Sequence, residues 1–118
     1  MSITENTLSL PLLDKSRVER LLTTDGNNSF YTEMIGLFDT RSAELLAEIQ
    51  AEMQNGKSHI RPQLHKLKGI CYSLGAQRLA AICNEMEALS EAAQLTAADI
   101  DLLIRTTRDT LEAQKKLL

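Results

Sequence analysis

The clearest hydrophobic pattern in the chain lies between residues 59 and 76, where apolar residues recur at steps of four and three. They are Ile60, Leu64, Leu67, Cys71 and Leu74. This spacing places side chains on one face of an α-helix, so the pattern predicts a helix from about His59 to Ser73 with one buried face. Gly75 ends the helix, because glycine readily takes the left-handed conformation that closes one. Pro62 is tolerated because it falls in the first turn.

Two helices are predicted before this stretch. A short one follows Pro11-Leu12-Leu13-Asp14, where Asp14 can cap the first turn, and its inward residues are Val18, Leu21 and Leu22. A turn signal, Asp25-Gly26-Asn27, separates it from a long helix that begins near Asn28 or Ser29 and ends at Asn55-Gly56. The apolar positions of the long helix are Phe30, Met34, Leu37, Phe38, Leu45, Ile49 and Met53. Ser58 is a candidate cap for the helix that comes next.

Two further helices are predicted after Gly75. One starts at Ala76, and its apolar face consists of Leu79, Ile82, Cys83, Met86 and Leu89. The other starts near Ala97 behind a capping pair, Thr96 and Asp99. Its inward residues are Ile100, Leu103, Ile104, Thr107 and Leu111.

The order of these elements predicts an all-α fold. Four substantial helices joined by short connections favour an antiparallel up-down-up-down bundle, with the short first helix lying across one end. Residues 1–10 are polar and show no period, so we expect a flexible tail or the remnant of a linker there, and a single domain over residues 11–118.

Composition agrees with one helical domain. The chain has 118 residues, 43% of them apolar, with two Phe, two Tyr and no Trp, so its core is built mainly from aliphatic residues. The net charge is −3 with both signs interspersed, which gives no basic patch for nucleic acid. No apolar run is long enough to span a membrane, and no signal sequence is visible. Cys71 and Cys83 occupy apolar helical positions and are expected to be reduced core thiols of a cytoplasmic protein, although a disulfide between them stays open.

The predicted His59–Ser73 helix carries polar residues on its outer flank. His65 lies roughly 140° from the centre of the apolar stripe, and Lys68, Arg61 and Tyr72 lie roughly 80°, 100° and 120° from it on the same side. Gly69 stands beside them, nearly opposite the core. An imidazole, an ammonium, a guanidinium and a phenol therefore share one solvent-facing flank around a bare stretch of backbone.

Gly69 is unusual because glycine in a helix interior costs about 0.5–1 kcal/mol relative to alanine. It is an incidental weakness, the site of a close helix crossing, or a gap that gives another protein access to His65. A crossing fits poorly with a position that points away from the apolar stripe.

These residues resemble a known family. The run His65-Lys66-Leu67-Lys68-Gly69, followed by Leu74-Gly75-Ala76, is similar to the signature of histidine-containing phosphotransfer domains, which is His-x-Leu-Lys-Gly and then Gly-Ala. The likeness continues outward to Leu79, Cys83, Met86 and Glu87 and covers roughly Leu13 to Leu118. Lys66 departs from the pattern, because the family often has Thr or Ser there. The family is a four-helix bundle with an exposed, phosphorylatable histidine near the middle of one helix.

The resemblance implies a phosphorelay intermediate. His65 would accept a phosphoryl group from the aspartyl phosphate of a receiver domain and pass it to another receiver. Lys68 would offset charge on the phosphoryl oxygens, and the less favoured alternative is a solubilising surface lysine. Arg61 and Lys66 would help to steer the receiver, and Tyr72 would line the docking surface, unless these are ordinary surface residues.

The residues also leave open a function other than phosphotransfer. The main alternative is a helical adaptor that docks receivers or other partners without being phosphorylated. A metal site is not expected, since His59 points about 120° away from His65 and no His/Cys pair has ligand spacing. No nucleotide motif is present, so we expect no ATP binding, no enzymatic activity of the isolated domain and no cofactor, with any magnesium held by the receiver.

The segment Leu10-Pro11-Leu12-Leu13-Asp14 resembles the linker before such domains at the end of hybrid sensor histidine kinases. It implies an excised C-terminal domain, from the cytoplasmic part of a membrane-attached kinase. In isolation we expect a monomer without direct membrane contact.

Overall fold

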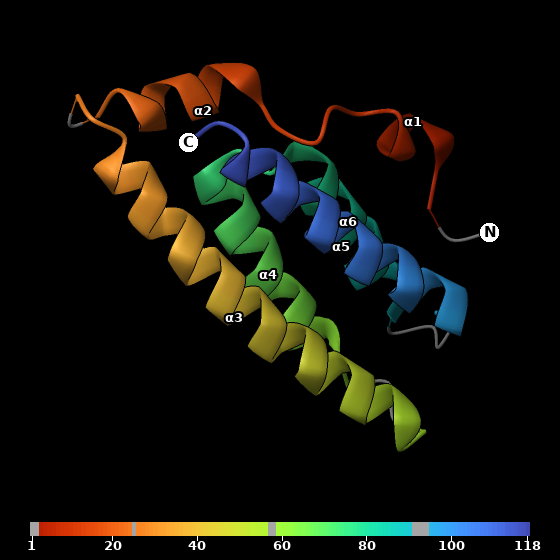
Figure 1. Ribbon diagram of the computed structural model, residues 1–118. Helices are drawn as coiled ribbons and strands as arrows, with labels where there is room; N and C mark the ends of the chain where they lie inside the picture. Colours follow the sequence, from red (N-terminus) through yellow and green to blue (C-terminus); the bar gives the residue numbers. More distant parts are fainter. Residues whose placement is uncertain (1–2, 25, 57–58, 91–94) are drawn as a thin grey trace.

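The computed structural model describes residues 3–24, 26–56, 59–90 and 95–118, which contain helices and no strand. The six helices are α1 (Glu5–Leu8), α2 (Lys15–Leu22), α3 (Ser29–Gln54), α4 (Arg61–Leu74), α5 (Gln77–Ser90) and α6 (Ala97–Lys115). The four longest, α3 to α6, form an antiparallel bundle in which each helix packs on the next and α6 closes onto α3 (Figure 1). This is the fold that the hydrophobic pattern predicts, with α2 as the short extra helix.

Helix α3 is the longest element, and its buried face differs from the expected one. All but one of its buried residues step by four and three along one face: Tyr31, Ile35, Phe38, Ser42, Leu45 and Ile49, with Leu46 buried beside them. Phe30 and Leu37, two of the predicted apolar positions of this helix, are 36% and 65% exposed. The N-terminal half of the helix is rotated by one residue relative to that expectation, because Tyr31, Ile35 and Phe38 form the continuous stripe with Leu45.

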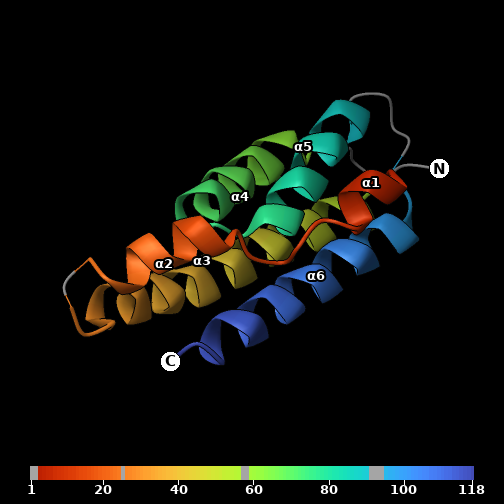
Figure 2. The same ribbon diagram turned by 90° about the horizontal axis from the view of Figure 1, so that it is seen from above.

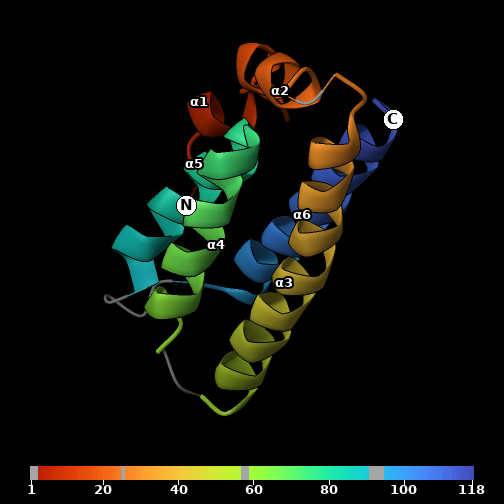
Figure 3. The ribbon, with the colours of Figure 1, turned by 90° about the vertical axis from the view of Figure 1, so that its left-hand side faces the viewer.

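The turn between α4 and α5 is built on Gly75. Its φ of +72° lies in the left-handed region, as expected for a glycine that ends a helix. The backbone carbonyl of Gly75 accepts a hydrogen bond from the amide of Asp14 at 2.7 Å, and Arg17 Nε donates to the carbonyl of Ser73 at 3.3 Å. These contacts hold α2 across the ends of α3 and α4 (Figure 3).

The N-terminal segment from residue 3 packs against the bundle and includes the short helix α1, which shows no periodicity in the sequence. Ile3 and Thr7 are 3% and 8% exposed, and α1 packs on α5 (Figure 2). Thr4 caps α1 and donates its hydroxyl to Glu85 Oε1 at 2.9 Å. The segment shows no periodicity because α1 is a single turn that buries only Thr7, while Ile3 is buried just before it. The division into a linker and a domain over residues 11–118 stays a prediction.

The helix boundaries otherwise follow the predicted caps. Thr96 and Asp99 form a reciprocal capping box at the start of α6, and Asp14 caps α2. At the start of α3, the side chain of Asn27 accepts the amide of Ser29 at 3.1 Å, while Asn28 makes no side-chain cap. The predicted cap Ser58 lies outside the described residues. Within the described ranges, no helix combines the length and the apolar character needed to cross a membrane.

The two cysteines are buried and free, and the packing of α4 on α5 brings them together. A hydrogen bond with Cys83, together with burial, raises the pKa of the Cys71 thiol far above its usual range. Cys71 therefore stays protonated and packs as a small apolar residue.

Candidate functional site

The outer side of α4 presents a row of residues that we call the His65 face: His65, Gly69 and Tyr72. The side chain of His65 is 71% exposed, Tyr72 is 60% exposed, and Gly69 is exposed between them. The three lie at i, i+4 and i+7, so they follow one another along the helix surface. Arg61 and Lys66 are also exposed on α4, as expected.

Lys68 does not lie in the solvent, which corrects the expected position of its side chain. It is only 16% exposed and packs toward α5, where its Nζ lies 3.0 Å from Glu87 Oε1 and donates to Asn84 Oδ1 at 3.3 Å. At roughly 80° from the centre of the apolar stripe, Lys68 stands on the border between core and surface. The packing of α5 against that border covers the aliphatic stem of Lys68 and places its ammonium against α5.

Glu87 is the one residue of this site to which the local sequence pattern assigned no role. It is 7% exposed on α5, and both of its carboxylate oxygens lie 3.4 Å from His65 Nδ1. One carboxylate thus faces both the imidazole and the ammonium of Lys68. A signal was present in the sequence, because Glu87 follows the apolar residue Cys83 by four positions and so falls on the inward side of its helix.

This arrangement favours one tautomer of the imidazole. An ionised carboxylate accepts hydrogen bonds and donates none, so the ring nitrogen that faces Glu87 is the one that carries the proton. The other ring nitrogen, Nε2, then holds its lone pair on the exposed side of His65. The ammonium of Lys68 offsets the negative charge of Glu87, which keeps the site close to neutral before a ligand arrives.

The surroundings of Gly69 are open. Apart from the backbone of its own helix, a Cβ atom built on this residue would meet no atom of the described residues within 4 Å. A close helix crossing, one of the three explanations for this glycine, is therefore wrong. An incidental weakness and a cleared approach to His65 both remain compatible with the geometry.

The other chemistry-bearing residues are not gathered into a site. His59 lies just before α4 and is exposed. Among the residues that the structure describes, no group of three His, Cys, Asp or Glu side chains is placed to hold a metal ion.

Comparison with known protein families agrees with this geometry. A family model of the Hpt domain matches residues 33–115, a span that includes all of α4, α5 and α6 and most of α3. The chain belongs to the Hpt domain family. Domains of this family transfer phosphoryl groups through a histidine in phosphorelays of two-component systems, interact with receiver domains, and lack the ATP site of a kinase. Searches of the curated proteins and of the solved structures found no match.

Proposed function

We propose that His65 is the phosphoacceptor of this Hpt domain. It takes a phosphoryl group from the aspartyl phosphate of one receiver domain and gives it to another. The observation that carries this assignment is the exposed imidazole whose Nδ1 faces the buried Glu87 carboxylate at 3.4 Å. That contact leaves the nucleophilic nitrogen pointing toward a partner.

The transfer step follows from this orientation. The lone pair of Nε2 attacks phosphorus in line with the acyl phosphate bond, the new N–P bond forms, and the P–O bond to the receiver's aspartate breaks. The electron pair of the broken bond stays on the aspartate, which leaves as a carboxylate. The proton on Nδ1 is retained beside Glu87, which stabilises the positive charge that develops on the ring. The reverse step delivers the phosphoryl group to the second receiver.

Lys68 supports this step electrostatically. Its ammonium already lies at the edge of the site, 3.0 Å from the carboxylate that His65 also contacts. A phosphoryl group on His65 brings negative charge, and the Lys68 ammonium can then interact with the phosphoryl oxygens as well as with Glu87. Its low exposure argues against a solubilising surface lysine. The remaining alternative is a purely structural ion pair with Glu87.

Receiver docking is assigned to the His65 face, with Arg61 and Lys66 contributing positive charge near the imidazole. The open space around Gly69 admits another protein's surface without a steric obstacle. Exposed Tyr72 offers an aromatic contact of the kind that protein interfaces favour. In this proposal the magnesium ion belongs to the receiver, and the domain itself uses no cofactor, does not react with ATP and is a monomer. Its place is in the cytoplasm, as part of a hybrid sensor histidine kinase.

The competing function is an adaptor that docks receivers without being phosphorylated. To separate the two, radiolabelled receiver domains from the same organism are mixed with the wild-type chain and with His65→Gln and His59→Gln variants. Acid-labile label should appear on the wild type and on His59→Gln, and His65→Gln should bind the receiver but stay unlabelled. Label on the His65→Gln variant would move the acceptor elsewhere, and binding without any labelling of the wild type would favour the adaptor.

A further inference from the structure

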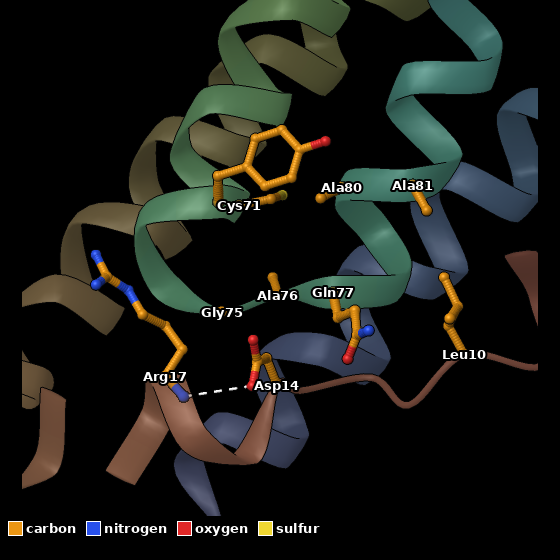
Figure 4. A pocket seen from close by; sticks show the side chains of 10 residues that line it. Leu10, Asp14, Arg17, Cys71, Gly75, Ala76, Gln77, Ala80 and Ala81 are labelled. Atoms are coloured by element: carbon orange, nitrogen blue, oxygen red, sulfur yellow. Dashed lines mark hydrogen bonds between the residues drawn. The ribbon is translucent and has the colours of Figure 1, made fainter. Parts of the chain in front are cut away.

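A cavity of about 330 Å³ lies where α2, α4 and α5 meet (Figure 4). Its apolar lining comes from the last turn of α4, the turn that follows it and the first turns of α5, with Leu10 on one side. The apolar residues are Leu10, Cys71, Ala76, Ala80 and Ala81. Its polar lining comes from Asp14, Arg17, Tyr72 and Gln77. The volume is at the lower end of the range of small-molecule sites and suits a single long side chain.

This cavity is continuous with the His65 face, because Tyr72 belongs to both. Tyr72 is seven residues beyond His65, a distance of about 10 Å along a helix axis. A partner of ordinary size covers roughly 800 Å² on each side, which corresponds to a patch of about 16 Å radius. A receiver centred on His65 therefore reaches the mouth of the cavity whenever it extends along α4 in the direction of Gly69 and Tyr72.

The polar groups at the cavity favour a cation. The Asp14 carboxylate lies at the edge of the cavity, and the guanidinium of Arg17 points away from it (Figure 4). Arg17 Nε is instead hydrogen-bonded to the carbonyl of Ser73. The Asp14 carboxylate accepts a hydrogen bond from the backbone amide of Arg17 at 3.3 Å. A carboxylate has about four acceptor positions in all, so it can accept further hydrogen bonds. The ring of Tyr72 adds an aromatic face suited to a cation.

We propose that this cavity anchors an arginine or lysine side chain of the docked receiver domain. The inference rests on the proposed function, since it takes receiver docking at His65 as given. The aliphatic stem of the occupant lies against the alanines of α5, and its charged end meets Asp14. The two ends of the docking surface then carry opposite charges. Arg61 and Lys66 are positive near the N-terminal end of α4, and Asp14 is negative beyond the C-terminal end of α4. Such an arrangement of charges orients a partner as well as holding it.

The test uses two substitutions that change the cavity in different ways. Ala81→Leu fills it, and Ala47→Leu makes the same change at an exposed alanine of α3 that does not line it. Asp14→Asn removes the charge but keeps the cap of α2, because asparagine caps a helix as well as aspartate does. The receiver used is the one that transfers fastest to the wild type. Dissociation constants and transfer rates are measured for each variant, together with labelling of His65 by phosphoramidate, a small donor that needs no docking.

Ala81→Leu and Asp14→Asn should each raise the dissociation constant for the receiver about tenfold, the size typical of an anchor residue. Ala47→Leu should leave it unchanged, and all three variants should be labelled by phosphoramidate at the wild-type rate. Unchanged receiver binding by Ala81→Leu would overturn the anchor. Weaker binding by Ala81→Leu but not by Asp14→Asn would overturn its cationic occupant. If phosphoramidate does not label the wild-type chain, that result would instead contradict the assignment of His65 as the phosphoacceptor.

Discussion

Gly69 provides the sharpest test of the His65 face, because its two remaining explanations predict different outcomes. If the residue is an incidental weakness, any well-tolerated side chain there should stabilise the bundle without affecting transfer. If it clears the approach to His65, a long side chain should slow transfer in a domain that remains folded. The side chain at position 69 stands one turn from the imidazole, at i+4.

The stability change can be worked out from the structure. An added Cβ meets no atom within 4 Å, and Gly69 does not have a positive φ, so no steric or backbone cost opposes the substitution. The gain from Gly69→Ala is then the difference in helix propensity, about 0.5–1 kcal/mol. For a domain of this size, that corresponds to a rise in Tm of roughly 2–5 °C.

The effect on transfer is expected to depend on the length and charge of the new side chain. Gly69→Ala should transfer at close to the wild-type rate. Gly69→Gln places a long neutral side chain beside the imidazole and should slow transfer from the receiver by about tenfold or more, equivalent to about 1.4 kcal/mol in the barrier. Gly69→Glu has the same shape but adds a negative charge near the phosphoryl group, so it should be slower still.

The assay combines thermal unfolding with receiver-to-domain transfer rates, and α3 offers a matched control. Gly36 is also an exposed helix-interior glycine with nothing within 4 Å of an added Cβ. Gly36→Ala and Gly36→Gln should therefore raise stability in the same way and leave transfer unchanged. Phosphoramidate labelling should stay normal in Gly69→Gln, since a small donor needs no docking space. A stable Gly69→Gln variant that transfers at the wild-type rate would refute the access role of this glycine.

Three further outcomes are expected. Lys68→Ala should slow transfer and also lower the free energy of unfolding by about 1–3 kcal/mol, because it leaves buried Glu87 without its ammonium partner; normal transfer rates would make Lys68 purely structural. Gly75→Ala should destabilise the fold by at least about 1–2 kcal/mol in chemical denaturation, since φ is +72° and the new Cβ would lie 3.1 Å from Arg17 Cβ; a neutral result would show that the turn relaxes freely. Burial raises the pKa of Tyr31 to about 12 from 10.0, so the unfolded chain loses this proton first and the free energy of unfolding should fall between pH 10 and 12, by up to about 3 kcal/mol. Tyr31→Phe should remove that loss, and an unchanged alkaline profile would contradict the buried, protonated phenol.

The local periodicity of the chain was enough to predict helices α2 to α6 and the exposed flank of α4, but not the short helix α1. The steps from Leu64 to Leu74 define which side of α4 is buried, and the opposite side then follows from helix geometry, so His65, Gly69 and Tyr72 were correctly predicted to be exposed. Gly56 and Gly75 were correctly predicted to end helices, since both take a positive φ. These features depend only on residues within one or two turns of each other.

Features that depend on neighbouring helices were decided by the tertiary structure. Lys68 stands at the border of its stripe, and only the packing of α5 determined that its ammonium would meet Glu87, nineteen residues away in the sequence. The same packing brought His65 Nδ1 to that carboxylate. In α3, apolar residues occur on more than one side, so the sequence left the rotation of the helix ambiguous, and the positions of α4 and α6 selected Tyr31 over Phe30. Contacts between distant parts of the chain depend on how helices are placed against one another, and periodicity within one helix carries no information about that placement.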